Sequence, residues 1–292
     1  LQGAQLKALL VKVKSLSPMP IGIQLAHAGR KASTDKPWDG RGQLAPSHAQ
    51  GWQTISASNL PFYPQDHAPH AMTVADIQQL IADFAASAKR AVDAGFDLIE
   101  LHAAHGYLLH QFMSPLSNRR TDEYGGSFAN RIRLTLEVFQ AMKNVVPEGF
   151  PIGVRLSATD WMDDVASWDV ESSIGLSKAL EQLGAVYIHV SSGGLHVEQK
   201  LDIHAGFQVP FAEAIKKTVN IPVIAVGLIT EAMQAEGILQ YEQADAIGIA
   251  RAILYDPRWP WHAAAELGET VCITPQYLRC QPHGLSGLFQ AF

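Results

Sequence analysis

The chain has 292 residues, of which 47% are hydrophobic and 17% charged, and its net charge is −6 at pH 7. This composition excludes a disordered chain and argues against nucleic acid as a partner. No apolar run reaches the roughly 18 residues that a membrane-spanning helix needs. With only Cys272 and Cys280, a disulfide framework is excluded, so we expect a cytoplasmic protein.

Strand and helix signals alternate along the chain. Apolar, β-branched strands followed by helices are typical of a parallel sheet with helices outside it. The expected strands cover 20–26, 97–102, 151–157, 185–192, 221–227 and 245–251. The expected helices cover 5–14, 74–94, 130–145, 170–183, 209–219, 231–240 and a last one from Trp259 to Gly268. Thr73, with Asp76 three residues later, predicts a capped start for the helix 74–94.

These units indicate an α/β fold, a TIM (β/α)8 barrel that lacks its first two strand units and keeps six parallel strands. The chain opens inside a helix, with neither a capping residue nor an initiator methionine. We therefore expect one N-terminally incomplete barrel domain over residues 1–292. The alternative, an open six-stranded sheet by design, would expose two apolar edges.

The long segment 28–72 separates the first expected strand from the next helix. It is rich in glycine, proline and polar residues and carries Trp38 and Trp52. Long irregular segments inside a domain are usually functional. Because this one follows a strand, we expect it to lie over the catalytic face of the barrel.

A group of proton-handling residues ends the strand 97–102. His102, His105 and Tyr107 leave the strand within the sequence DLIELHAAHGYLLHQF. Active sites of (β/α) barrels lie at the C-terminal ends of strands. Imidazoles can donate N–H groups to an oxygen, and a phenol can donate a proton. The alternative is that these histidines are structural.

Strand alternation predicts which side chains face the barrel axis. Gln24, Glu100, His102 and Arg155 fall on the inward set of their strands, so Gln24, Arg155 and His102 should meet near the top. A planar ligand with ring nitrogens and carbonyls would satisfy an amide and a guanidinium. The alternative is a buried ion pair between Arg155 and Glu100.

The last two strands each end in a turn suited to phosphate. Gly227 precedes a helix with Thr230 as its candidate cap, and Arg251 follows the last strand. Loops after the seventh and eighth strands of barrels commonly bind phosphate.

Several segments together resemble one enzyme family, the flavin-dependent Old Yellow Enzymes, or NADH:flavin oxidoreductases. They are QLAHAGRKAS at 24–33, AGFDLIELHAAHGYLLHQFMSPLSNRRTDEYGGSFANR at 94–131, VRLSATD at 154–160, SSGG at 191–194, AVGLI at 225–229 and ARAIL at 250–254. The HAGRK run and the histidine pair are most similar to the bacterial class that includes xenobiotic reductases and NADPH dehydrogenases. The resemblance spans nearly the whole chain.

The resemblance implies an ene-reductase that uses FMN as cofactor and NADPH or NADH as reductant. The implied FMN contacts are Gln24, Arg155, Gly227, Ala250 and Arg251. Hydride would pass by a ping-pong route to the C=C bond of an activated alkene, an α,β-unsaturated carbonyl or nitro compound. His102 and His105 would bind the activating oxygen, and Tyr107 would protonate the α-carbon.

The resemblance also implies a homo-oligomer, in which Arg279 reaches the neighbouring subunit's substrate site. A surface salt bridge is the alternative for Arg279. Family members carry further N-terminal residues that contact flavin, and these have no counterpart in this sequence. Ala250 stands where many members have glycine.

Two other functions were weighed against this one. A metal-dependent barrel hydrolase would draw on His27, His102, His105 and His110, but their spacing does not suit a metal site and no carboxylate completes it. A non-catalytic remnant of a barrel is the second alternative, and it rests on the missing strands. The physiological substrate cannot be inferred from the sequence.

Overall fold

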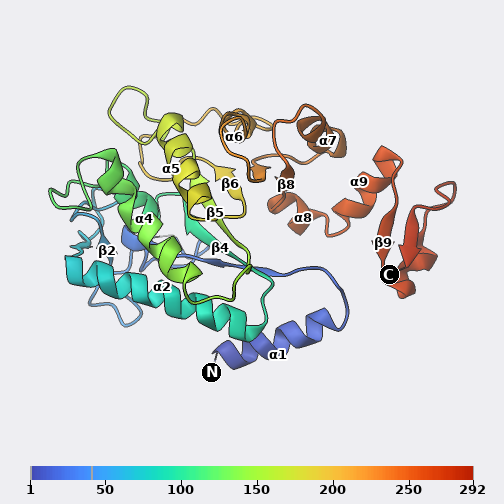
Figure 1. The fold of residues 1–292 in the computed structure, drawn as a ribbon, viewed down its shortest axis with the longest axis horizontal. Coiled ribbons are helices and arrows are strands. Elements are labelled where there is room, and N and C mark those ends of the chain that lie inside the picture. Colours follow the sequence, from blue (N-terminus) through green and yellow to red (C-terminus); the bar gives the residue numbers. More distant parts are fainter. Residues whose placement is uncertain (1, 41, 292) are drawn as a thin grey trace.

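A curved sheet of six parallel strands forms the centre of the molecule. The computed structural model describes residues 2–40 and 42–291, so the two ends of the expected domain and one residue of the expected loop lie outside the described residues. The strands are adjacent in the order β1-β4-β5-β6-β7-β8 and curl as part of a barrel does (Figure 1). Their bounds are β1 Gly22–Leu25, β4 Leu98–Ala103, β5 Ile152–Ser157, β6 Ile188–Ser191, β7 Val223–Val226 and β8 Ala246–Gly248. The predicted incomplete parallel barrel is confirmed.

Helices cover the outer face of this sheet. They are α2 (Val74–Ala94), α4 (Phe128–Lys143), α5 (Val170–Gln182), α6 (Val209–Lys216) and α7 (Ala232–Gln240), with α1 (Gln2–Lys14) packed along α2. Figure 1 shows α2, α4 and α5 side by side outside the strands. The hydrophobic core lies between the two layers, where outward side chains of the strands such as Ile99, Leu101 and Val154 are fully buried.

The N-terminal cap of α2 agrees with the prediction, whereas that of α7 does not. Thr73 Oγ1 accepts the N–H of Asp76, whose carboxylate accepts the N–H of Thr73 in return, which confirms the predicted cap. Gly95 ends the helix with φ of 98°, in the left-handed region. The expected cap of α7 at Thr230 is wrong, because Glu231 takes the N-cap position without a side-chain hydrogen bond.

The inward face of the sheet carries the polar set that strand alternation predicted. Register pairs Gln24 with Glu100 and His102 with Arg155 across neighbouring strands, so these side chains share one face. Glycines on this face make room for large neighbours. A side chain at Gly153 would meet the Tyr187 ring at 2.1 Å.

Some short elements were not predicted. The loop 28–72 holds η1 (Gly29–Lys31), β2 (Ile55–Ser56) and β3 (His70–Ala71), and further on lie α3 (Leu108–Met113) and α8 (Arg251–Tyr255). Such pieces span about one turn or one residue pair, too short for a hydrophobic period to register.

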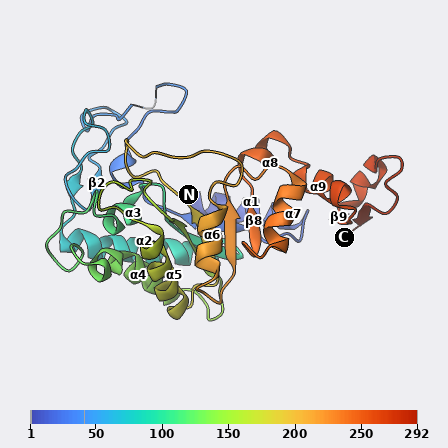
Figure 2. The same cartoon turned by 90° about the horizontal axis from the view of Figure 1, so that it is seen from above.

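The C-terminal elements project away from the sheet. They are α9 (Trp259–Leu267), β9 (Val271–Ile273), η2 (Pro275–Cys280) and β10 (Phe289–Ala291). Both ribbon views show this segment extending from the side where α7 and α8 lie (Figure 2). Among the described residues, none of the helices combines the length and the apolar character that crossing a membrane requires.

Candidate active site

Three aromatic side chains gather at the C-terminal end of β4, as predicted. The His102 ring centroid lies 5.1 Å from that of His105 and 5.2 Å from that of Tyr107. His102 is 3% exposed, yet neither of its ring nitrogens has a hydrogen-bond partner within the described chain. A buried polar group without a partner costs about 1–3 kcal/mol. The imidazole is therefore suited to a ligand oxygen rather than to a structural contact.

Burial and a nearby cation keep both imidazoles neutral. Burial, followed by the charge of Arg155, lowers the pKa of His102 to about 4. The same two causes in the same order lower the pKa of His105 to about 2. At neutral pH each ring therefore has one N–H donor and one acceptor nitrogen. The pair can polarise a bound oxygen by hydrogen bonding but cannot supply a proton to it.

The backbone between the histidine and the tyrosine adopts a left-handed conformation. His105 has φ of 58° and Gly106 has φ of 69°. At Gly106 a side chain would meet the carbonyl oxygen of Gly194 at 2.1 Å, so glycine is required there. The hydroxyl of Ser157 accepts the N–H of His105 at 2.9 Å, and a His105 ring nitrogen lies 2.6 Å from Ser191 Oγ.

Arg155 remains free for a ligand. Its buried Nε has no hydrogen-bond partner among the described residues. The expected alternative, an ion pair with Glu100, is wrong, because Glu100 contacts His189 Nδ1 at 2.9 Å and accepts the Gln24 amide at 2.5 Å. Burial lowers the pKa of Arg155, and the charge of Glu100 opposes this shift. The guanidinium keeps its charge at neutral pH.

A cavity of about 310 Å³ extends from His105 and Arg155 to the C-terminal ends of β7 and β8. Its lining includes His105, Arg155, Gly227, Ala250 and Arg251, five of the residues expected to bind substrate or cofactor. His102 and Tyr107 lie beside it, in ring contact with each other. Gln24 does not line it and bonds to Glu100 instead, and Arg279 lies exposed on η2 in the projecting C-terminal segment.

Ser191, Ser192 and Gln208 line the cavity, although no role was predicted for them. Gln208 donates its amide to the carbonyl of Val226 at 2.7 Å and accepts the Ser192 hydroxyl at 2.7 Å. Ser191 contacts both Gln208 and His105. Gly227 has φ of 121°, and a side chain there would meet the Gln208 amide nitrogen at 2.4 Å. In the sequence, the SSGG run at 191–194, quoted above for its resemblance, was the feature that pointed to Ser191 and Ser192.

Two basic residues after β1 also carried no assigned role. Lys31 Nζ donates to the carbonyls of His105 and Gly194 at 2.9 and 2.8 Å and lies 5.5 Å from the centre of the Tyr107 ring. Burial, followed by the charge of Arg30, lowers the pKa of Lys31 to about 8. Arg30 and Lys31 belong to the HAGRK run, which was quoted above for its resemblance. These contacts place Lys31, near the start of the loop 28–72, beside the residues that follow β4 and β6.

The residues present fit the isoalloxazine and phosphate of a flavin mononucleotide. A guanidinium with an unpartnered buried nitrogen suits an electron-rich ring edge. A second arginine, at the start of α8, lines the far end of the same cavity and suits an anion. By contrast, residues 2–40 and 42–291 contain no cluster of three His, Cys, Asp or Glu side chains able to hold a metal ion, so the hydrolase alternative has no ligand set there.

Comparison with known sequences assigns the family. The model of the NADH:flavin oxidoreductase / NADH oxidase family matches residues 2–269. An NADPH dehydrogenase of Geobacillus sp. (strain WCH70) is 44% identical over 259 residues, which are 89% of this chain and 70% of that protein. An NADH:flavin oxidoreductase of Gibberella zeae is 44% identical over 271 residues, 88% of this chain and 65% of that protein. The chain thus spans about two thirds of the length of such relatives.

Solved structures agree with this assignment. Morphinone reductase in complex with tetrahydroNAD superposes with a TM-score of 0.71 at 25% identity, over 99% of this chain and 74% of the reductase. A histamine dehydrogenase from Rhizobium sp. 4-9 gives 0.69 at 28% identity, over 85% of this chain and 34% of the dehydrogenase. The chain therefore belongs to the NADH:flavin oxidoreductase / NADH oxidase family, in which FMN is the cofactor and NAD(P)H the reductant.

Proposed function

We propose that the protein is an ene-reductase: an FMN-dependent NAD(P)H oxidoreductase that reduces the C=C bond of activated alkenes. The observation that carries the proposal is His102, a buried, neutral imidazole with two unpartnered nitrogens beside His105 and Tyr107. When bound, FMN supplies the redox step, taking a hydride from NAD(P)H and passing it to the β-carbon of the alkene.

The histidine pair supports the choice of substrate class. Two neutral imidazoles with ring centroids 5.1 Å apart would hold a carbonyl or nitro group and stabilise the negative charge that develops on it. Such a group is what activates an alkene toward hydride. Because His102 and His105 are neutral, they would lower the energy of the charged oxygen without protonating it.

Tyr107 would supply the proton that completes the reduction. Its ring centroid lies 5.2 Å from that of His102, which supports a place for the tyrosine beside the proposed oxyanion site. A phenol within reach of the α-carbon can act as general acid. Lys31 Nζ lies 5.5 Å from the Tyr107 ring centre, a contact that helps to hold the ring in place.

Arg155, Gly227, Ala250 and Arg251 would hold the cofactor, with Gln24 at its pyrimidine edge. Arg155 would stabilise negative charge on the reduced ring. We further propose that the active form is a homo-oligomer in which Arg279 contributes to the neighbouring subunit's substrate site. Its exposure and its place on the projecting C-terminal segment support this role.

The test is a pair of half-reactions on the purified protein. The protein should carry a flavin absorption band that bleaches with NADPH under anaerobic conditions and returns on addition of cyclohexenone. A protein that purifies without flavin and takes up none would support the remnant alternative. Bleaching without recovery by the enone would keep the flavin oxidoreductase and contradict the alkene substrate.

A further inference from the structure

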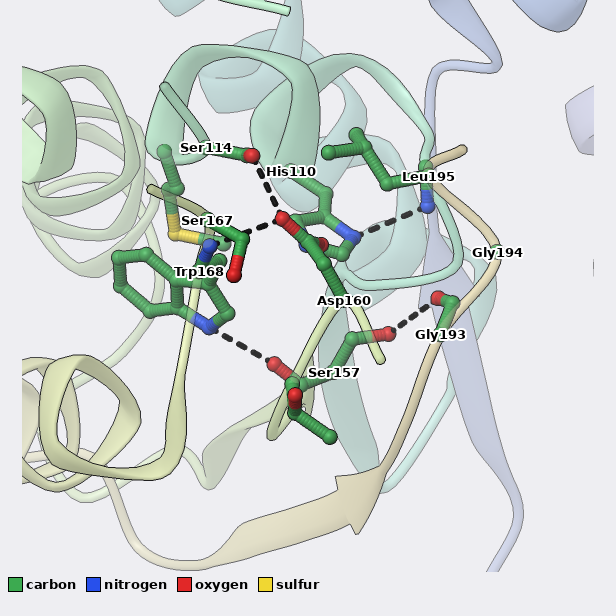
Figure 3. Close-up of polar contacts among 12 residues, drawn as sticks. His110, Ser114, Ser157, Asp160, Ser167, Trp168, Gly193, Gly194 and Leu195 are labelled. Carbon is green, nitrogen blue, oxygen red and sulfur yellow. Dashed lines mark hydrogen bonds and ion pairs between the residues drawn. The ribbon is translucent and has the colours of Figure 1, made fainter. Parts of the chain in front are cut away.

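A second histidine, His110, lies behind the candidate active site with its own acidic partner. His110 and Asp160 are both fully buried, with His110 Nε2 2.9 Å from Asp160 Oδ1. The other oxygen of this carboxylate accepts the Ser114 hydroxyl at 2.6 Å and the backbone N–H of Trp168 at 2.9 Å (Figure 3). Neither residue lines the cavity described above.

His110 also binds the backbone of the active-site loop. Its Nδ1 accepts the N–H of Gly106 at 3.0 Å. An imidazole nitrogen that accepts a hydrogen bond carries no proton, so in the neutral ring the proton must be on Nε2. That proton faces Asp160, although its direction is not well aligned with the carboxylate oxygen. The carboxylate thus favours the one tautomer that leaves an acceptor for Gly106.

The peptide groups around Gly106 are held on every side. The carbonyl of Gly106 accepts the Gln111 amide at 2.7 Å, and the N–H of His105 is bound by Ser157. The carbonyl of His105 accepts Lys31. Two consecutive left-handed residues are costly outside glycine, so the loop needs such contacts to keep its conformation. His105 and Tyr107 flank Gly106 directly, so its position sets theirs.

We propose that His110 and Asp160 are positioning residues for the reaction, acting through the tautomer of His110. Asp160 keeps the His110 proton on Nε2, Nδ1 then holds the N–H of Gly106, and the loop presents His105 and Tyr107 to the substrate. The proposal rests on the function proposed above for those two side chains. A buried carboxylate that orients a histidine is a recurring device in enzymes.

Asp160→Asn tests the tautomer. The two hydrogen bonds from Ser114 and Trp168 fix the amide oxygen on their side, so the amide NH2 faces His110 Nε2. An Nε2 proton would then face this NH2, so the proposal predicts that the ring moves its proton to Nδ1, where it opposes the N–H of Gly106. We expect ¹⁵N chemical shifts of histidine-labelled protein to show the exchanged tautomer, and the Gly106 amide to exchange with solvent at least tenfold faster. An unchanged tautomer would overturn the proposal.

The functional measurement is the affinity for a phenol, whose oxygen would be bound by the histidine pair under the function proposed above. Asp160→Asn should weaken phenol binding at least tenfold while FMN affinity stays within twofold. Ser114→Ala is the matched control, because it removes a hydrogen bond to the same carboxylate without touching Gly106. It should lower the melting temperature and leave phenol affinity unchanged. Equal phenol affinity in Asp160→Asn and wild type would reduce the pair to a structural role.

A second pair of variants covers the case in which Asp160→Asn does not fold. His110→Asn keeps an acceptor near the position of Nδ1, whereas His110→Leu removes it, and both lose the contact to Asp160. Phenol affinity should be retained within about threefold by asparagine and lost at least tenfold by leucine. Equal loss in both variants would overturn the proposal. If the wild type binds no phenol and reduces no alkene, the proposed function fails, and Gly106 exchange alone then decides this inference.

Discussion

His102 of β4 and Arg155 of β5 are partners in the register of the parallel sheet, and each has a buried nitrogen without a hydrogen-bond partner in residues 2–40 and 42–291. Neighbouring strands thus place a neutral donor and a permanent cation at one level of the barrel mouth. The charge of Arg155 is also a cause of the lowered pKa of both His102 and His105. Under the proposed function, these side chains would bind electron-rich oxygen and ring atoms without a mobile proton of their own, and protonation would be left to Tyr107.

Tyr107→Phe should separate the two halves of the reaction. The substitution removes the hydroxyl proton and keeps the ring contact with His102. Flavin reduction by NADPH should proceed at the wild-type rate, whereas alkene reduction should slow by a factor on the order of 10² to 10⁴. Anaerobic stopped-flow absorbance measures the two steps separately. Equal slowing of both steps would contradict the role of Tyr107 as proton donor.

Replacing both histidines by alanine should abolish phenol binding and retain FMN. His105 lines the cavity and His102 lies beside it, and both are proposed ligands of the substrate oxygen. Titration with a phenol, followed through the flavin spectrum, should give no saturable change in the His102→Ala, His105→Ala protein. Loss of the flavin during purification would instead assign these residues to the cofactor site.

Arg155 should control the redox potential more than the fold. Arg155→Met keeps the length of the side chain and removes the charge that would stabilise the reduced flavin. The midpoint potential should fall by about 30 mV or more, which for two electrons equals a tenfold shift in the equilibrium. Arg155→Lys is the matched control and should retain part of the effect. An unchanged potential in the methionine variant would remove Arg155 from the flavin site.

Stability should fall as the pH drops from about 7 toward 4. The pKa of His102 is lowered to about 4 and that of His105 to about 2 in the folded chain, whereas both are near 6.5 when unfolded. Below pH 6.5 the unfolded state takes up protons that the folded state refuses, so acid favours unfolding and pH above 6.5 has no such effect.

Urea unfolding at pH 7.5 and pH 5 measures this difference. The wild type should lose on the order of 1–2 kcal/mol per histidine over this interval. The double variant His102→Asn, His105→Asn should lose correspondingly less, since it has no such groups to protonate. If the free energy of unfolding changed equally with pH in the two proteins, the pKa values of His102 and His105 would not be lowered by folding.

The sequence predicts which strand faces carry this site better than it predicts the contacts among the side chains. Strand alternation placed Gln24, Glu100, His102 and Arg155 on one face, because a period of two is unambiguous in an extended chain. It could not decide the partner of Glu100. His189 was available only once the register of β5 and β6 was known, and that register depends on packing rather than on local pattern.

The contacts that shape the loop were beyond sequence reasoning for a different reason. His110 entered the sequence analysis only within the hydrolase alternative, Gln111 had no assigned role, and α3 is too short to show a hydrophobic period. Their function depends on the backbone groups of Gly106, which no side-chain pattern reports. Lys31 likewise acts on two carbonyl oxygens far away in the sequence.

The contact between Gly106 and Gly194 limits how this enzyme can be re-engineered. Each glycine stands so near the other segment that a methyl group would collide with main-chain atoms, at 2.1 Å for position 106 and 2.6 Å for position 194. Mutant libraries aimed at new substrates should therefore leave both codons untouched. Diversity belongs instead at exposed positions of the 28–72 segment such as Trp38, which is 78% exposed, and Trp52, which is 54% exposed, and not at Lys31, which binds the carbonyls of His105 and Gly194.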